Sequence, residues 1–243
     1  MLWLFEQIEK LDDHAVLKLL PQISSERREK VLRMRDRSTQ IQLITAEFLL
    51  RLALWEEYGI RRLPAVAHEK NGKPFFPDHP KICFNLSHCQ TAVACAVDAS
   101  PVGVDVQDVG CLYSAPSRVG SDQALPSSAT RAVAQEAVQS LLWVLHSAER
   151  AWVLSGETAA ERERRFLIIW TYKEAFGKAT GAGILYEMDQ FNFLPSFESG
   201  SCYARSFQSF SRTDTVLTLC AQAPLEFRVV SIQELFASGY TVP

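Results

Sequence analysis

The sequence has few cysteines, and none stands at a spacing used by metal sites or by small disulfide-linked domains. Its six cysteines are scattered over 243 residues, with no C-x-x-C or C-x-x-H spacing. This excludes a zinc ribbon or finger and gives no sign of a secreted disulfide framework. A chain of this length buries roughly 70% of its unfolded surface, so its core needs neither kind of support. We therefore expect a reducing, cytoplasmic setting.

Long apolar runs are also missing. The least charged stretch, residues 82–97, is interrupted by polar side chains and is too short to cross a bilayer. The opening MLWLFEQIEK has no basic region ahead of a long apolar segment, so we expect a first strand there and not a signal peptide. No membrane partner is expected.

The chain has no excess of positive charge. The 25 basic residues are outnumbered by 28 acidic ones, which argues against a general nucleic-acid binder. One segment departs from this balance, because residues 24–37 hold six Lys or Arg against three Asp or Glu. A solvated helix face would explain such a segment, and so would a site for a polyanionic ligand.

Periodicity predicts an α-then-β unit in the first half. Ser24 or Ser25 can cap a first helix, and apolar residues at three- and four-residue steps predict a helix over about 38–58 that Gly59 ends. The Asn71-Gly72 pair then predicts a hairpin between 65–69 and 73–76, with Pro74 on an edge. Short strands are expected at 81–86, 91–97 and 102–106.

The same order of elements recurs in the second half. Residues 110–128 have the Ser, Ala, Pro and Gly content of a linker. Helices are expected at about 131–145, after Ser147, and from the Thr158-x-x-Glu161 capping box to near Gly181. Strands at 201–207, 215–222 and 227–232 and a short helix near Glu234 follow. We predict an α+β fold of two similar α/β halves, with boundaries at 1–109, 110–130 and 131–243.

Three segments carry polar side chains within apolar structure. FNLSHC ends a strand in Ser87 and His88, and in GVDVQ the strand alternation points Asp105 and Gln107 to the same side. WTYKEAFGK places Glu174 and Lys178 one helical turn apart. Each has an ordinary explanation: a structural histidine, a chance strand-end pair and an i,i+4 salt bridge. The chemical explanation is a hard-cation site beside a general base and a phosphate-binding cation.

Taken together and in this order, FNLSHC, GVDVQ and WTYKEAFGKATGAGI resemble the signature segments of the 4′-phosphopantetheinyl transferases, in their larger, surfactin-type class. The resemblance extends to the basic segment SSERREK and to the turn NGKP. It implies two similar halves related by a pseudo-twofold axis, with the active site between them. It further implies transfer of the phosphopantetheine arm of coenzyme A to a serine of an apo acyl or peptidyl carrier protein, with release of adenosine 3′,5′-bisphosphate.

The resemblance also assigns roles to individual residues. Asp105, Gln107 and Glu174 would hold Mg²⁺, Glu174 would also be the general base, and Lys178 would neutralise phosphoryl oxygens. The residues implied at the coenzyme are Arg27, Lys30, Lys73, Pro74, Ser87 and His88.

Two departures from the family pattern qualify these roles. Many members carry Glu where this chain has Gln107, so weaker Mg²⁺ binding or a preference for Mn²⁺ is a hypothesis. Ile41 and Gln42 stand where some relatives are basic, which leaves coenzyme contacts from that helix in doubt.

Other functions remain open at this point. The chain could be a catalytically weak module that binds coenzyme A or a carrier protein, or a metal-dependent phosphoanhydride hydrolase. For the transferase we expect a monomer, since the two joined halves already form an interface, and residues 111–125 are a candidate contact for the carrier protein.

Overall fold

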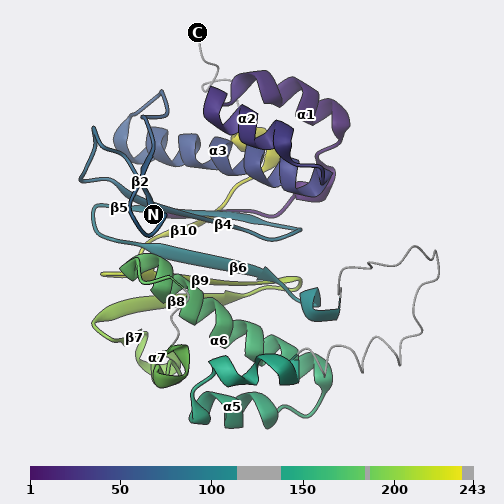
Figure 1. Ribbon diagram of the computed structural model, residues 1–243, viewed down its shortest axis with the longest axis vertical. Coiled ribbons are helices and arrows are strands. Elements are labelled where there is room, and N and C mark those ends of the chain that lie inside the picture. The colour runs from purple at the N-terminus through teal and green to yellow at the C-terminus, as the bar shows by residue number, and fades with distance from the viewer. Residues whose placement is uncertain (114–137, 184–186, 237–243) are drawn as a thin grey trace, which may run out of the picture.

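Two four-stranded sheets form the middle of the molecule, and helices cover their outer faces (Figure 1). This computed structural model describes residues 1–113, 138–183 and 187–236. The first sheet has the order β10-β1-β5-β4: Phe227–Val229, Leu2–Phe5, Val93–Asp98 and Cys83–His88. The second has the order β6-β9-β8-β7: Gly103–Asp108, Thr215–Ala221, Arg205–Ser211 and Ser201–Cys202.

One long helix covers each sheet. α3 (Arg37–Tyr58) packs on the first sheet and α6 (Ala159–Thr180) on the second, and each has 22 residues. Gly59 and Gly181 end these helices in the left-handed conformation, which glycine adopts without a steric penalty. The repeated helix-on-sheet arrangement confirms the predicted α+β fold of two similar halves.

The two halves exchange strands. β6 precedes the linker in sequence but pairs with β9 of the second sheet, while β10 from the end of the chain pairs with β1 of the first. At the junction, the amides of Val104 and Val106 on β6 donate to side chains of β4, Asn85 Oδ1 at 2.9 Å and Ser87 Oγ at 3.3 Å. Polar side chains on the edge strand of the first sheet thus accept hydrogen bonds from backbone amides on the edge strand of the second.

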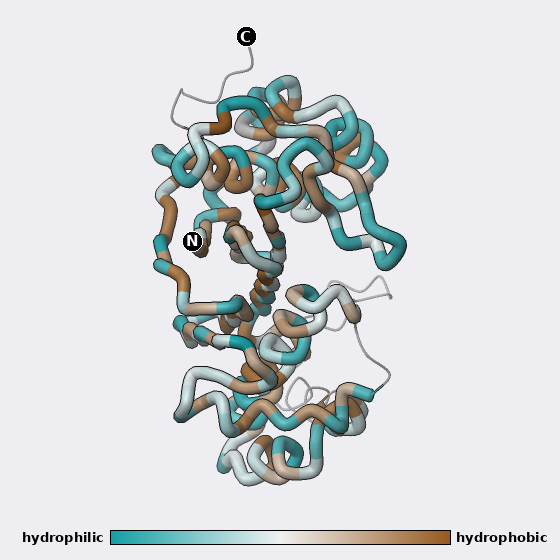
Figure 2. Tube along the Cα trace, turned by 90° about the vertical axis from the view of Figure 1, so that its left-hand side faces the viewer, coloured by the Kyte–Doolittle hydropathy of each residue, from teal (hydrophilic) through white to brown (hydrophobic). Residues whose placement is uncertain are grey.

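Strand alternation divides the core into layers. On β1, Trp3 and Phe5 face α3, whereas Leu2 and Leu4 face an apolar layer between the two sheets. Val104 and Val106 of β6 lie in that same inner layer. Figure 2 shows the hydrophobic colour concentrated along the central strands and polar segments toward the outside. Asp105 and Gln107, on the alternate positions, therefore face α6, as the alternation predicts.

The remaining elements complete the outer layers. The hairpin predicted around Asn71-Gly72 is present as a two-stranded sheet. The bounds are β2 Ala67–His68, β3 Pro74–Phe75, α1 Asp13–Leu19, α2 Ser25–Arg33, α5 Ser147–Leu154, α7 Ser196–Ser199 and α8 Ile232–Leu235. No helix in the described ranges is both long enough and apolar enough to cross a membrane.

The single strand expected over 201–207 is wrong. Tyr203 and Ala204 have positive φ angles of 52° and 56°, so the chain turns there and pairs β7 with β8 as a hairpin. The alternation of aromatic and polar residues predicted a continuous strand. Tyr and Ala rarely adopt positive φ angles, so neither residue indicated a turn. The linker beyond Tyr113 and the helix expected at 131–145, up to residue 137, lie outside the described residues, so the boundaries at 110 and 131 stay a prediction.

Candidate active site

The site begins with an unusually close contact between helix α6 and strand β6. A Cβ atom on Gly103 would overlap the carbonyl oxygen of Ala175 and the amide nitrogen of Ala179. Glycine therefore lets the helix backbone lie directly on the strand. This contact brings the last turns of α6, with Glu174 and Lys178, onto the Asp105 side of β6.

Asp105 is the centre of a polar network at this contact. Lys178 Nζ donates to Asp105 Oδ1 at 2.6 Å, to the carbonyl of Val104 at 3.1 Å and to Ser87 Oγ at 3.2 Å. Ser87 Oγ also donates to Asp105 Oδ1 at 3.0 Å, and Gln107 Nε2 donates to Oδ2 at 3.0 Å. Asp105 is 2% exposed, so these donors take the place of its lost hydration.

Glu174 stands beside this network with an unused carboxylate oxygen. Its Oε1 is buried and has no hydrogen-bond partner among the described residues. Burial, followed by the negative charge of Asp105, raises the pKa of Glu174, while Lys178 lowers it in part. A half-buried carboxyl with a raised pKa and a free oxygen is suited to accept a proton or bind a cation.

The three residues predicted to hold a metal fit a magnesium ion by their chemistry. Asp105 and Gln107 lie on one face of β6 and are joined by a hydrogen bond. Glu174 lies close enough that the negative charge of Asp105 raises its pKa. Among the described residues there is no group of three or more His, Cys, Asp or Glu that could hold a metal. Two carboxylates and one amide oxygen nevertheless suit Mg²⁺, which retains several waters and is completed by phosphate oxygens. The orphaned Oε1 of Glu174 supports this fit.

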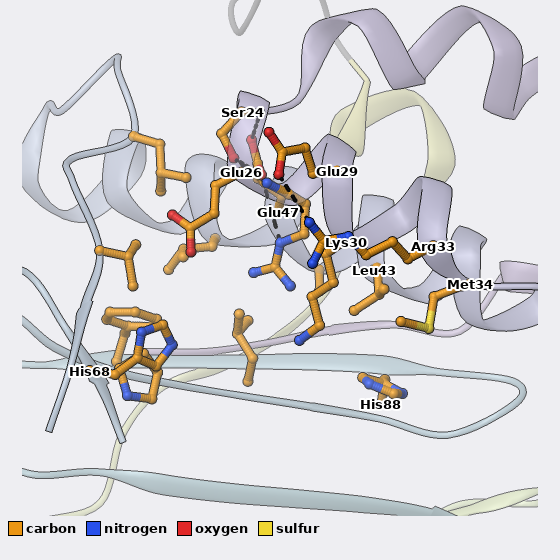
Figure 3. A pocket seen from close by; sticks show the side chains of 18 residues that line it. Ser24, Glu26, Glu29, Lys30, Arg33, Met34, Leu43, Glu47, His68 and His88 are labelled. Carbon is orange, nitrogen blue, oxygen red and sulfur yellow. Dashed lines mark hydrogen bonds and ion pairs between the residues drawn. The ribbon is translucent and has the colours of Figure 1, made fainter. Parts of the chain in front are cut away.

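A pocket of ≈ 600 Å³ opens between α2, α3 and β4. Four of the six residues predicted to bind coenzyme line it, namely Arg27, Lys30, Pro74 and His88. Figure 3 shows the Lys30 side chain reaching from α2 toward the strand that carries His88. Part of the lining is apolar, with Leu43, Leu50 and Phe84 among its members. The lining thus combines basic side chains and an apolar wall, which suit a ligand with both a phosphate and a ring system, with the carboxylates of Glu26, Glu29 and Glu47.

His88 lies where the basic residues converge. His88 is exposed at the end of β4, but partial desolvation and the nearby cations Lys178, Lys30 and Arg27 lower its pKa, against a smaller opposing effect of Asp105. Lys178 belongs to the polar network of Asp105, whereas Lys30 and Arg27 belong to the pocket. His88 therefore marks the place where the pocket meets the carboxylate site.

The structure places Lys73 and Ser87 outside the set of residues that line the pocket. Ser87 belongs to the Asp105 network instead. Lys73 Nζ donates to the last carbonyls of α6, Lys178 O at 2.7 Å and Ala179 O at 3.0 Å, and Asn71 donates to Gly181 O at 2.7 Å. The NGKP turn therefore caps the C-terminal end of the helix that carries Glu174 and Lys178.

Neither residue that stood in doubt on α3 lines the pocket. Ile41 is buried in the core, and Gln42 donates to the carbonyl of Cys89 at 2.8 Å. Helix α3 instead contributes Leu43, Ala46 and Glu47 to the pocket. Sequence reasoning gave Glu47 no role at the site, because an acidic residue within a long helix usually faces solvent.

Sequence reasoning also missed a buried ion pair behind the site. Lys173 lies next to Glu174 in the signature segment, yet its ammonium points into the second half and pairs with Glu149 at 2.8 Å. It also donates to the carbonyls of Met188 and Phe191. No local sequence pattern indicates this pair, because its members belong to different helices.

Comparisons with known proteins agree with this geometry. The family model of the 4′-phosphopantetheinyl transferase superfamily matches residues 101–223. The 4′-phosphopantetheinyl transferase psf-1 of Bacillus pumilus is 30% identical over 190 residues, covering 76% of this chain and 71% of that protein. The transferase Sfp of Bacillus subtilis (strain 168) is 23% identical over 228 residues, covering 88% and 89%. A fungal transferase, pptA of Paxillus involutus, is 27% identical over 180 residues, covering 72% and 65%. The chain belongs to the 4′-phosphopantetheinyl transferase superfamily and is an enzyme of that class.

Proposed function

We propose that this enzyme transfers the 4′-phosphopantetheine arm of coenzyme A to a serine of an apo acyl or peptidyl carrier protein, with Mg²⁺ at Asp105, Gln107 and Glu174. The observation that carries the proposal is the unpartnered Oε1 of Glu174 beside the Asp105–Lys178 pair, at the junction with the basic pocket. Family membership supports the same reaction.

The reaction needs a base, because a serine hydroxyl is a weak nucleophile at neutral pH. Glu174 would accept the hydroxyl proton at Oε1, and the serine oxygen would form a bond to the β-phosphorus of the coenzyme. The bond from that phosphorus to the bridging oxygen breaks, and adenosine 3′,5′-bisphosphate leaves with the electron pair. Lys178 would hold the charge that develops on the phosphoryl oxygens. The metal ion, when bound, would supply further charge neutralisation along the pyrophosphate.

The pocket would hold the other end of the coenzyme. Arg27, Lys30 and His88 would bind the 3′-phosphate as charge-assisted donors, with Pro74 near the adenosine. Lys73 and Ser87, which the family resemblance also assigns to the coenzyme, lie at the helix cap and in the Asp105 network. Lys73 would therefore contribute by holding the end of α6, and Ser87 would contribute through its hydrogen bond to Asp105.

With Gln107, the proposed metal site has one negative charge fewer than it would have with a third carboxylate. We propose that Gln107 weakens Mg²⁺ binding and leaves Mn²⁺ an acceptable substitute, since a neutral oxygen attracts a hard cation less strongly.

A cytoplasmic location and a monomeric state are part of the same proposal. Support for the former comes from the six cysteines, all of which are free thiols in the structure.

The test is intact-mass spectrometry of an apo acyl carrier protein and an apo peptidyl carrier domain, each incubated with the enzyme, coenzyme A and Mg²⁺. The expected result is a gain of one phosphopantetheine arm that a chelator abolishes. No gain on either acceptor, together with calorimetric coenzyme A binding, would favour a binding module instead.

The candidate carrier contact at 111–125 lies almost wholly outside the described residues. Shortening it should raise the carrier KM.

A further inference from the structure

Glu47 is a fully buried carboxylate at the back of the basic pocket. Its side chain is 0% exposed, and it is a lining residue of the pocket. Oε1 accepts the amide of Ser24 at 2.7 Å, and Oε2 accepts the hydroxyl of Ser24 at 2.8 Å. Arg51 pairs with Oε1, and Arg27 Nε lies 3.8 Å from Oε2. Glu26 and Glu29 also line the pocket but are exposed, whereas Glu47 is buried, so its charge must be balanced by the partners that surround it.

Those partners connect α3 to the start of α2. Ser24 is the N-cap of α2, and its hydroxyl also accepts the amide of Arg27 at 3.3 Å. Arg51 donates to the carbonyl of Gln22 at 2.8 Å, which holds the segment just before the cap. Figure 3 shows the Glu47 carboxylate beside Ser24, above the pocket. The Glu47–Arg51 pair of α3 therefore fixes both the first residues of α2, through Glu47, and the chain that leads into it, through Arg51.

Helix α2 depends on such contacts for its position. It has nine residues, which is too short for independent stability, and Val31 is its single fully buried residue. Arg27 lies in its first turn, beside Glu47, and Lys30 follows one turn later. Glu47 thus helps to set where α2 presents Arg27 and Lys30 to the pocket.

We propose that Glu47 is a positioning residue for recognition of the coenzyme's 3′-phosphate. It anchors the N-terminus of α2 and orients Arg27, so that Arg27 and Lys30 meet the phosphate without first having to be ordered. The inference rests on the proposed function, because it takes the pocket as the coenzyme site. It adds a residue that acts through Arg27 and Lys30 and sets the discrimination between coenzyme A and 3′-dephospho-coenzyme A.

The test compares these two ligands in calorimetric titrations of the wild type, Glu47→Gln and Glu149→Gln. Glutamine keeps the shape of Glu47 but removes the charge that holds Arg27 and Arg51. Glu47→Gln should weaken coenzyme A binding by about tenfold and leave 3′-dephospho-coenzyme A binding within about twofold. In steady-state assays it should raise the coenzyme KM and leave kcat unchanged.

Glu149→Gln is the matched control. Glu149 is also 0% exposed, accepts two main-chain amides, from His146 at 2.9 Å and Phe193 at 2.8 Å, and is paired with Lys173. Its loss should reduce stability in a similar way but change the affinity for both ligands by the same factor. An equal loss for both ligands in Glu47→Gln would overturn the inference, because Glu47 would then be merely structural.

Two further results separate the possible failures. A wild type that does not prefer coenzyme A over its dephospho form would refute the pocket assignment and, with it, the role of Glu47, whereas a preference that survives Glu47→Gln would refute the role of Glu47 alone. If Glu47→Gln does not fold by circular dichroism, Ser24→Ala decides, since it removes the bond to Oε2 and leaves the Arg51 pair intact. Ser24→Ala should also lose affinity selectively for coenzyme A, and an unchanged preference would overturn the inference.

Discussion

Lys178 Nζ lies 2.6 Å from Asp105 Oδ1, which joins the last turn of α6 to the middle of β6. The two residues are 73 positions apart in the chain. Asp105 in turn helps to raise the pKa of Glu174, which stands one helical turn before Lys178. One cation and two carboxylates therefore meet at this contact, and Asp105 and Lys178 act in opposite directions on the pKa of Glu174.

Replacing the base should separate binding from turnover. Glu174→Gln should lower kcat by about 10²–10⁴-fold, because a positioned general base contributes that much, while much of the coenzyme A binding persists. Quenched-flow assays with intact-mass detection give kcat, and calorimetry gives the affinity. Glu161→Gln, in the first turn of the same helix, is the control and should keep nearly full activity. Loss of folding in Glu174→Gln would assign Glu174 a structural role.

A third carboxylate should strengthen the metal site. Gln107→Glu should lower the Mg²⁺ concentration needed for half-maximal activity by about tenfold, since a charged oxygen binds a hard cation more strongly than an amide. The activity with Mn²⁺ relative to that with Mg²⁺ should decline in parallel. Titrations of both metals against wild type and variant measure this. An identical requirement in the two proteins would contradict a ligand role for Gln107.

Coenzyme binding should take up a proton at His88. The lowered pKa keeps His88 neutral at pH 7 in the free enzyme, and a bound phosphate dianion raises that pKa. The affinity for coenzyme A should therefore increase as the pH falls through the pKa of His88 in the complex. It should level off below the pKa of His88 in the free enzyme. Calorimetry in two buffers of different ionisation enthalpy counts the protons. The same uptake in His88→Gln would assign it to the phosphate or to another group.

The close contact at Gly103 should be indispensable to activity. Gly103→Ala would drive α6 away from β6 and separate Glu174 and Lys178 from Asp105. Overpacking of this kind should cost about 3 kcal/mol or more and abolish turnover. Val102→Ala, which removes volume beside it, should cost about 1–3 kcal/mol and leave the chemical step intact. Thermal unfolding and kcat measure the two effects. Full activity in a folded Gly103→Ala would refute the account of the contact.

Local patterns in the sequence were sufficient for much of the fold. The periodicity of residues 38–58 and the stop at Gly59 predicted α3 to within one residue at its start. Alternation in GVDVQ correctly placed Asp105 and Gln107 on one face. These features depend on helical and strand geometry within a few residues, which is why a single sequence carries them.

Long-range relationships could not be predicted in the same way. The exchange of β6 and β10 between sheets depends on pairing between segments more than a hundred residues apart. Nothing in NGKP indicated that Lys73 caps α6, and nothing around Glu47 marked a buried anchor. Such side chains acquire their partners only when distant segments are brought together by the core.

The most direct test of the central claim counts two products in one reaction. Enzyme, coenzyme A and Mg²⁺ are incubated with and without an apo carrier protein, and the free adenosine 3′,5′-bisphosphate and the carrier mass are measured together. A transferase releases one nucleotide for each arm gained by the carrier, and none without it. Nucleotide release in the absence of carrier, or without a gain in carrier mass, would identify water as the acceptor and contradict the account.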